Sequence, residues 1–301
     1  MELQWPLILF TTLVAWSAGT FGAQAVLALK GEGREVQVPA VVTSVVLLAL
    51  SGIAVFFHLQ HWERIFNGFG HITSGITQEL IAIVVFVVVA VVYFAMLRKS
   101  EDGGTVPKWL AVVAIAISAV LALVCAHSYM MAARPAWDTV VWPLVELGEA
   151  AALGSLTVMA MRAALAEGEG SASPSKLGGV AAVAGSVASA VLSVALVAVW
   201  QASAGSFADV GYHFDPTTPT SPLLDVAAET NVLSGELAPL VWLGVIVVGA
   251  LAPVACAVLA RKKGGKSWLA LGAAGVACAL VGCVCLRVAF YELGLSVFMF
   301  Y

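Results

Sequence analysis

Charged residues are scarce in this sequence. Only 11% of its 301 residues are charged and 61% are hydrophobic, whereas soluble domains carry about 25% charged residues. The remaining polar surface is too small to cover a globule in water, so composition excludes a soluble domain, a disordered chain and a coiled coil. The net charge is −4, and no basic stretch is longer than a loop, which excludes a nucleic-acid partner. We therefore expect an integral membrane protein whose partners are membrane lipid, lipid-soluble molecules or other proteins.

Cysteine motifs are also missing. The five cysteines all fall in apolar runs, and no two of them have the Cys-x2-Cys spacing of iron–sulfur ligands. A b-type haem needs only two facing histidines, and of the five histidines only His58 and His127 lie in or near apolar runs. Neither run offers the second histidine that a stacked pair of haems would need. We therefore expect no haem, no iron–sulfur cluster and no other metal site in this chain.

Long apolar runs are what the sequence has in place of charge. A membrane-spanning helix needs about 20 apolar residues, and segments such as 81–92 are apolar at every position rather than at every second one, which excludes barrel strands. We predict an all-α integral membrane protein with a single domain, 1–301, built as a bundle of eight transmembrane helices. The expected spans are 5–29, 38–59, 77–97, 108–131, 142–165, 177–202, 237–260 and 268–292. The first run has no positive segment before it, so we expect a retained helix rather than a cleaved signal peptide.

The basic residues predict how the bundle lies in the membrane. Eleven of the 14 Lys and Arg fall in the loops after the first, third, fifth and seventh spans, whereas the alternate loops hold only Arg64 and Arg134. Because basic loops stay on the cytoplasmic side, both termini should face outward. The long loop 203–236 then also faces outward. It carries five acidic residues, three prolines and no Lys or Arg, and we interpret it as a docking surface for a partner.

Ionisable residues within the apolar runs are costly in a membrane and therefore informative. With the topology above, all of them lie in the outer third of the bilayer, which predicts a polar pocket that opens toward the outer leaflet. An alternative for part of this set is a structural ion pair between Arg287 and one of three glutamates, Glu146, Glu149 or Glu292. The full set is His58, Glu79, His127, Glu146, Glu149, Arg287 and Glu292.

Two segments resemble a known family. The first reads His58-Leu59-Gln60-His61-Trp62-Glu63-Arg64-Ile65-Phe66-Asn67 and then Ser74-Gly75-Ile76-Thr77-Gln78-Glu79-Leu80; the second is Tyr129 followed by Arg134-Pro135-Ala136-Trp137-Asp138-Thr139. They resemble the loop after the second helix, and the Pro-x-Trp loop after the fourth, of the membrane-anchor subunit of dimethyl sulfoxide reductase-type molybdoenzymes. Gln60, Gly75 and Gln78 stand where that family commonly has a glycine, an aromatic residue and an arginine.

The resemblance implies a function and a site. It implies a quinol-oxidising anchor in the bacterial cytoplasmic (inner) membrane, with an iron–sulfur electron-transfer subunit and a molybdopterin catalytic subunit as partners. It carries over His58 and Glu79 as the residues that bind menaquinol. An imidazole can accept a quinol proton near neutral pH, and a carboxylate can orient the imidazole or pass the proton outward. We expect His127 and Arg287 to shape the pocket, with His61, Arg64, His71 and Gln78 as further candidates.

Other interpretations of the same residues remain open. His58 can be an interfacial histidine at a helix end, and Glu79 a first-turn carboxylate favoured by the helix dipole. The chain would then be a structural anchor or an assembly protein without quinol chemistry. A secondary transporter would need paired broken helices near the midplane. Pro253 interrupts one span, but no matching break occurs in another half of the chain.

Overall fold

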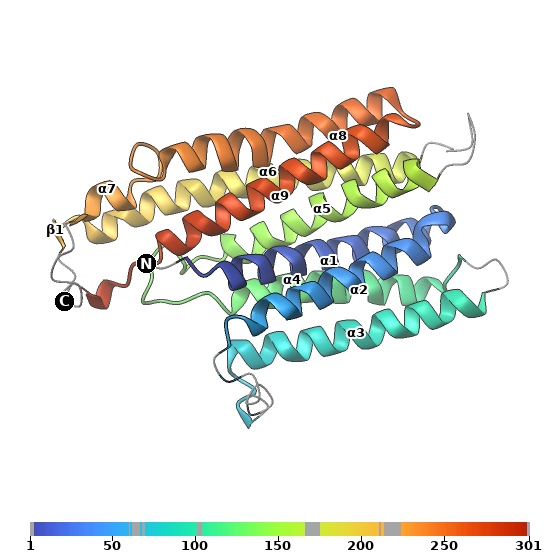
Figure 1. The fold of residues 1–301 in the computed structure, drawn as a ribbon, viewed down its shortest axis with the longest axis horizontal. Helices are drawn as coiled ribbons and strands as arrows, with labels where there is room; N and C mark the ends of the chain where they lie inside the picture. The colour runs from blue at the N-terminus through green and yellow to red at the C-terminus, as the bar shows by residue number, and fades with distance from the viewer. Residues whose placement is uncertain are drawn as a thin grey trace.

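The computed structural model describes residues 3–59, 61, 67, 70–100, 104–165, 175–210, 212–213 and 224–299. Long helices run side by side along one direction, and both termini lie at the same end of the bundle (Figure 1). The elements are α1 (Trp5–Leu29), α2 (Arg34–Phe56), α3 (Gly75–Lys99), α4 (Lys108–His127), α5 (Val141–Leu165), α6 (Lys176–Ser203), η2 (Ala204–Phe207), β1 (Tyr212–His213), β2 (Leu224–Asp225), α7 (Val226–Thr230), η3 (Leu240–Leu251), α8 (Ala252–Lys263), α9 (Ser267–Glu292) and η4 (Val297–Met299).

Within the described residues, eight helices are long and apolar enough to cross a membrane. This confirms the predicted all-α membrane fold with eight spans. The seventh span, Leu240–Lys263, combines η3 and α8. Its first half is a π-helix, and Pro253 lies in the first turn of the α-helical second half, directly after that π-helix.

The predicted limits of three spans were wrong. The second helix covers Arg34–Phe56 rather than 38–59, the fourth ends at His127 rather than at residue 131, and the seventh span covers Leu240–Lys263 rather than 237–260. Hydropathy marks where side chains are apolar, but a helix can continue into the polar interface because its backbone hydrogen bonds are satisfied internally. His58 therefore lies in the turn that follows α2 and not at the end of the helix.

The centre of the bundle is formed by α1 and α5, the spans with the largest buried share. Their backbones meet at Gly19 and Gly154, where a Cβ on either residue would overlap the backbone of the other helix. A small residue on α6 makes another close contact. A Cβ on its Gly185 would come 2.7 Å from the carbonyl oxygen of Ala151 in α5. Small residues thus bring three helices close enough to pack without large side chains between them.

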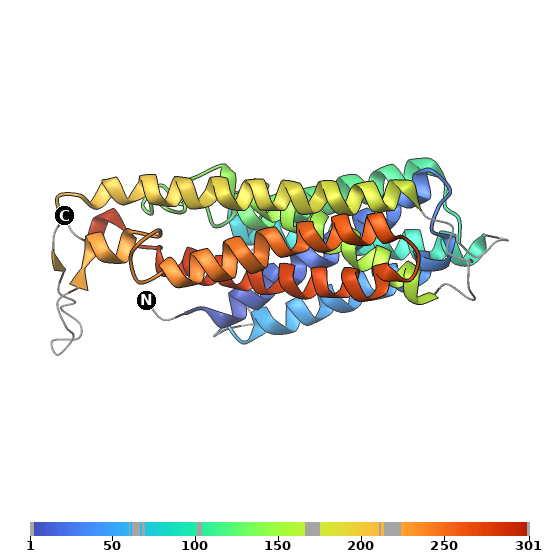
Figure 2. The ribbon, with the colours of Figure 1, turned by 90° about the horizontal axis from the view of Figure 1, so that it is seen from above.

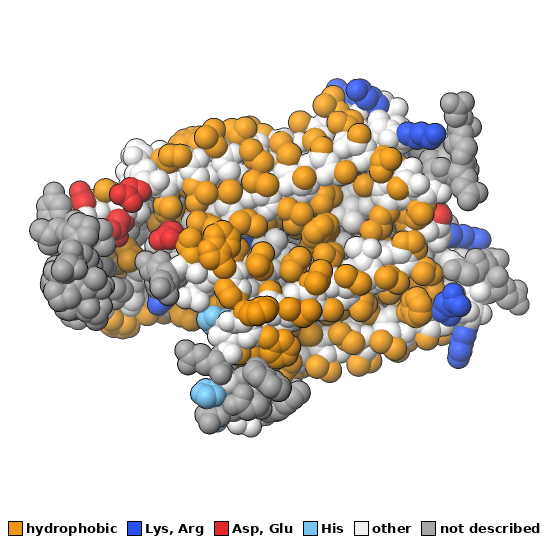
Figure 3. All heavy atoms as spheres, in the orientation of Figure 1, with side chains coloured by type: hydrophobic (Ala, Val, Ile, Leu, Met, Phe, Trp, Pro, Cys, Tyr) orange, Lys and Arg blue, Asp and Glu red, His pale blue; other side chains and the backbone are white. Residues whose placement is uncertain are grey.

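The two ends of the bundle differ in charge. Viewed from above, the N- and C-termini again share one end (Figure 2), which we call the termini end. Acidic side chains are visible there, whereas Lys and Arg gather at the opposite, basic end (Figure 3). Between the two ends the visible face is covered largely by hydrophobic side chains. An even number of spans places both termini on the same side of the membrane. The outward orientation of the termini stays a prediction.

Candidate functional site

Glu79 is buried near the start of α3. Its side chain is 9% exposed and accepts a hydrogen bond from the hydroxyl of Ser128, the residue that follows α4. Gly75, one turn earlier on α3, makes this approach possible, because a Cβ there would lie 2.8 Å from the Cβ of Ser128. Gly75 thus lets α3 and the end of α4 come together around Glu79.

Arg287 of α9 is the centre of a second polar cluster. Its side chain is 1% exposed. The guanidinium donates from Nη2 to Glu146 Oε2 at 2.5 Å and from Nη1 to Glu149 Oε2 at 2.7 Å, and its Nε donates to Thr11 Oγ1 at 2.8 Å. Three helices, α1, α5 and α9, are therefore joined through one arginine. Because both carboxylates are also nearly fully buried, these are charge-assisted bonds in an apolar surrounding, where hydrogen bonds are strong.

Aromatic residues pack beside this cluster at the termini end. The indole ring of Trp142 lies 5.8 Å from the Arg287 guanidinium carbon and stacks on Phe290 at 4.2 Å between ring centroids. Phe290 in turn stacks on Trp137 at 4.5 Å, and the Trp137 indole N–H donates to the Phe290 carbonyl at 2.6 Å. The Pro-x-Trp segment after α4 is therefore packed on α9 and does not lie free in solvent.

Tyr129 connects the two polar clusters. Its ring lies edge-on to those of Phe290 and Tyr291 on α9, at 6.4 and 6.5 Å between centroids. Burial raises the pKa of the Tyr129 phenol, and its electrostatic interactions with Tyr291 and Glu79 raise it further. Tyr129 thus touches α9 while it lies within electrostatic range of the carboxyl group on α3, so the two clusters belong to one polar region.

Three buried polar atoms of this region have no hydrogen-bond partner among the described residues. They are Oε1 of Glu146, the indole N–H of Trp142 and the hydroxyl of Tyr291. A desolvated polar atom without a partner costs about 1–3 kcal/mol. The region also places one buried arginine among three buried carboxyl groups, those of Glu79, Glu146 and Glu149. The arrangement therefore offers an unused carboxylate acceptor, an unused indole donor, an unused hydroxyl and an excess of proton-accepting groups.

The predicted site residues differ in how deeply their side chains are buried. Glu79 and Arg287 are buried, whereas His58, His61, His71 and His127 are exposed. The His58 side chain has no hydrogen bond to any described residue, and the partner of Glu79 is Ser128. His127 Nδ1 lies 3.4 Å from Met130 Sδ, and Gln78 Nε2 lies 3.5 Å from the carbonyl of Ile72. Arg64 lies outside the described residues.

The open question about the ion pair is settled by these contacts. Arg287 pairs with both Glu146 and Glu149, and within the described part of the chain no ion pair joins it to Glu292. Sequence reasoning missed Ser128, Thr11 and Trp142. Ser128 follows directly on a candidate histidine, and Thr11 is a polar residue in an apolar run, so both carried a weak signal. Among the residues that the structure describes, no three His, Cys, Asp or Glu side chains group so as to hold a metal ion.

Comparison with known proteins identifies the family. A search of curated proteins found no match. Among protein-family profiles, residues 1–207 match the DMSO reductase anchor subunit (DmsC). The matched part contains Glu79, Ser128, Glu146 and Glu149, and it ends before α9. Because the match covers more than half of the chain and agrees with eight apolar spans, this multi-pass membrane protein belongs to the family of DMSO reductase anchor subunits.

Proposed function

We propose that this chain binds and oxidises menaquinol at the termini end of the bundle and passes the electrons to an iron–sulfur subunit of a respiratory molybdoenzyme complex. The proposal places the complex in the bacterial cytoplasmic membrane. The observation that carries it is the polar region around Glu79 and Arg287, which contains buried polar atoms without partners. Membership of the anchor family supports the proposal, since a membrane anchor implies catalytic and iron–sulfur subunits with which it assembles.

The residues of the site must remove protons from the quinol. Oxidation of a quinol releases two electrons and two protons, so the site must hold groups that bind a hydroxyl and accept its proton. We propose that the His58 imidazole and the Glu79 carboxylate do this. Both lie at the termini end, because His58 follows α2 and Glu79 is near the start of α3. His58 is exposed, and in this proposal its ring nitrogens bind the quinol hydroxyl.

The second cluster would shape the same pocket. A quinol hydroxyl is both a donor and an acceptor, and it matches the unused Glu146 oxygen and the unused Trp142 N–H. The Arg287 guanidinium holds Glu146 in place through the other carboxylate oxygen. In this arrangement α5 and α9 would provide one wall, and α3 with the end of α4 would provide the other. His61, Arg64 and His127 remain proposed contributors from the loops.

The partner must approach this same end. The sequence has no cysteine motif for a cluster, so we expect the acceptor of the electrons to be a cluster in the iron–sulfur subunit. That subunit would dock on the termini end against the acidic segment 203–236, whose described elements include η2 and α7. The molybdopterin subunit would then attach through the iron–sulfur subunit. Membrane lipid surrounds the apolar faces of the spans.

The experiment that tests the proposal compares two electron donors in membranes that hold the assembled complex. We expect His58→Ala and Glu79→Gln to lower the rate of menaquinol oxidation at least tenfold, because proton acceptors typically contribute 10²–10⁴-fold. A reduced viologen dye, which can feed the partner subunits directly, should still support substrate reduction. Asp138→Asn removes an exposed carboxylate from the loop after α4 at the same end, outside both the proposed site and the docking segment, and is the matched control that should leave both rates unchanged.

The outcomes separate the alternatives. Loss of the quinol rate with a normal dye rate supports a quinol site at His58 and Glu79. Normal quinol rates in both variants would reject the site and favour a structural anchor. Loss of both rates together with loss of the partner subunits from the membrane would mean that these residues hold the complex together and do not bind quinol.

A further inference from the structure

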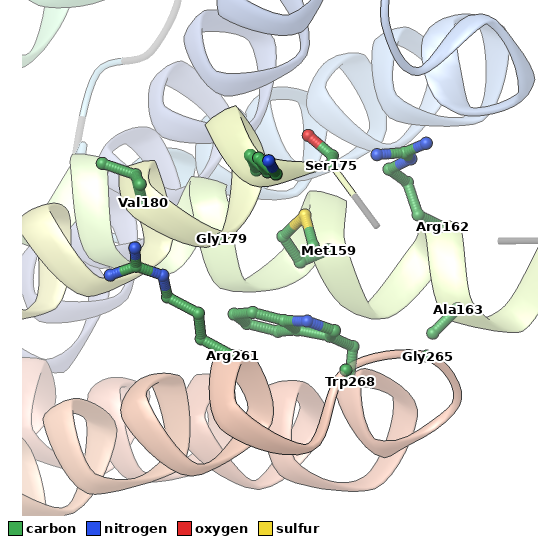
Figure 4. Close-up of a pocket in the computed structure, with 11 residues that line it drawn as sticks. Met159, Arg162, Ala163, Ser175, Gly179, Val180, Arg261, Gly265 and Trp268 are labelled. Atoms are coloured by element: carbon green, nitrogen blue, oxygen red, sulfur yellow. The ribbon is translucent and has the colours of Figure 1, made fainter. Parts of the chain in front are cut away.

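A pocket at the basic end of the bundle has no part in the quinol site. Its volume is about 440 Å³, and its walls come from the last turns of α5, the first turns of α6 and the turn between α8 and α9. Figure 4 shows the Trp268 ring lying between the side chains of Arg261 and Met159, with Gly179 and Val180 of α6 above. A Cβ on Gly179 would lie 3.5 Å from both Arg261 and Trp268, in ordinary van der Waals contact, and would fill part of this space.

The cations around this pocket are not all neutralised. Arg162 is paired, since its Nε donates to Glu35 Oε1 at 2.6 Å. Lys176 and Arg261 also line the pocket. Both are exposed, and neither forms an ion pair with a carboxylate of the described residues. Lys176 is the first residue of α6, where the helix dipole adds positive potential. Among the described residues, the pocket therefore presents two cations without an ion-pair partner, while the Glu32 carboxylate at its edge accepts a hydrogen bond from the lining residue Ser175.

The position of the pocket distinguishes a lipid from a dissolved anion. It lies where four spans, the fifth to the eighth, meet the basic end, and it contains Trp268, an amphipathic side chain of the kind that marks membrane interfaces. Next to it, Val180 is 43% exposed and Leu269 is 47% exposed. In a membrane, apolar side chains exposed on the outside of a span contact acyl chains. A ligand that uses the whole surface thus has an anionic head and an apolar tail.

We propose that this pocket binds the phosphate group of an anionic phospholipid, held between Lys176 and Arg261, with an acyl chain along Val180. Basic pockets between helices are known to bind acidic lipid head groups in this manner. Bound lipid would join α5, α6 and the α8–α9 turn, three parts of the chain that meet at this end. The site lies at the opposite end from Glu79 and Arg287, so it does not depend on the quinol proposal.

Thermal unfolding of the full purified chain in a neutral detergent tests the proposal. A ligand that binds only the folded state raises the unfolding temperature. We expect short-chain phosphatidylglycerol to raise it in a saturable manner, and phosphatidylcholine with the same acyl chains to do so much less, because its choline cation opposes Arg261. Inorganic phosphate at the same concentration should have little effect. An equal effect of inorganic phosphate would overturn the lipid assignment in favour of a free-anion site, and equal effects of the two lipids would overturn the role of charge.

Charge-matched variants locate the site. Lys176→Gln with Arg261→Gln should weaken the apparent affinity for phosphatidylglycerol by about tenfold to thirtyfold, which corresponds to about fivefold for each cation. Lys262→Gln with Lys263→Gln removes the same charge from the adjacent turn, outside the pocket, and should change the affinity by less than about threefold. If the double pocket variant does not fold, Arg261→Gln alone should still lose about fivefold, and Arg261→Lys should retain binding. An equal loss in the Lys262 and Lys263 variant would show that binding is only general attraction to a basic surface.

Discussion

Replacing Arg287 by glutamine should destabilise the bundle strongly. The substitution removes the cation that faces Glu146 and Glu149, whose side chains are 1% and 3% exposed. It also removes the bond from Nε to the Thr11 hydroxyl. Removing one partner of a buried ion pair costs about 3–5 kcal/mol, because the other charge stays buried without compensation. We therefore expect Arg287→Gln to lower the free energy of unfolding by about 3–5 kcal/mol.

A triple variant separates charge from packing. Arg287→Met combined with Glu146→Gln and Glu149→Gln leaves no charge in the cluster and keeps side chains of similar volume. Replacing a whole buried ion cluster by neutral residues is often close to neutral in stability. We expect the triple variant to recover most of the loss and to lie within about 2 kcal/mol of the unchanged protein. Arg98→Gln is the control, because Arg98 is exposed and substitutions at exposed positions usually change stability by no more than about 0.5 kcal/mol.

The assay is equilibrium unfolding in mixed micelles with increasing sodium dodecyl sulfate, followed by the helical circular dichroism signal. The order of stability should be unchanged protein, Arg98→Gln, triple variant and then Arg287→Gln. Equal stability of Arg287→Gln and the unchanged protein would refute the reasoning, since it would mean that the two carboxylates do not need the arginine. A triple variant as unstable as Arg287→Gln would show that packing and not charge dominates.

Three further predictions concern two close helix contacts, at Gly75 and at Gly19, and the side of the membrane on which residue 203 lies. Gly75→Val should push α3 away from the loop after α4 and lower quinol oxidation in the assembled complex, whereas Gly70→Val, with open space around its Cβ, should not. Gly19→Val should force α1 and α5 apart and reduce the amount of folded protein in membranes; Gly52→Val, also in a helix but with open space, is the control. A cysteine introduced at Ser203 should react with an impermeant thiol reagent added outside intact cells, and labelling only after the membrane is opened would contradict outward termini.

The spans were predictable because one property, the lack of polar side chains over about 20 residues, is sufficient to place a helix in a membrane. The limits of α2 were not, because Arg34 to Gln37 are polar or interfacial residues that remain helical through backbone bonds alone. His58 shows the consequence. Hydropathy assigns it to a span, whereas the helix ends at Phe56 and leaves it in a turn.

The residues of the polar region were largely predictable, but their pairing was not. An ionisable side chain in an apolar run is visible in the sequence, and this signal identified Glu79, Glu146, Glu149 and Arg287. Which glutamate meets Arg287 depends on how α5 and α9 are rotated against each other, and periodicity within each helix does not fix that rotation. The contact of Ser128 with Glu79 likewise depends on the absence of a side chain at Gly75.

Some polar atoms around Arg287 are hydrogen-bonded and others are not, and this difference helps to decide whether the cluster only stabilises the fold or also binds a ligand. Each of the three guanidinium nitrogens donates a hydrogen bond, whereas Oε1 of Glu146 and the Trp142 N–H have no partner among the described residues. A cluster that served stability alone would gain nothing from leaving an acceptor and a donor desolvated, at about 1–3 kcal/mol each. The unsatisfied atoms therefore point to a further polar group, supplied by water or by a ligand. Glu146→Gln keeps the shape of the side chain but lowers its ability to accept a proton. A quinol rate that falls in this variant at unchanged stability would identify the ligand as quinol, because water as the partner gives no reason for that rate to change.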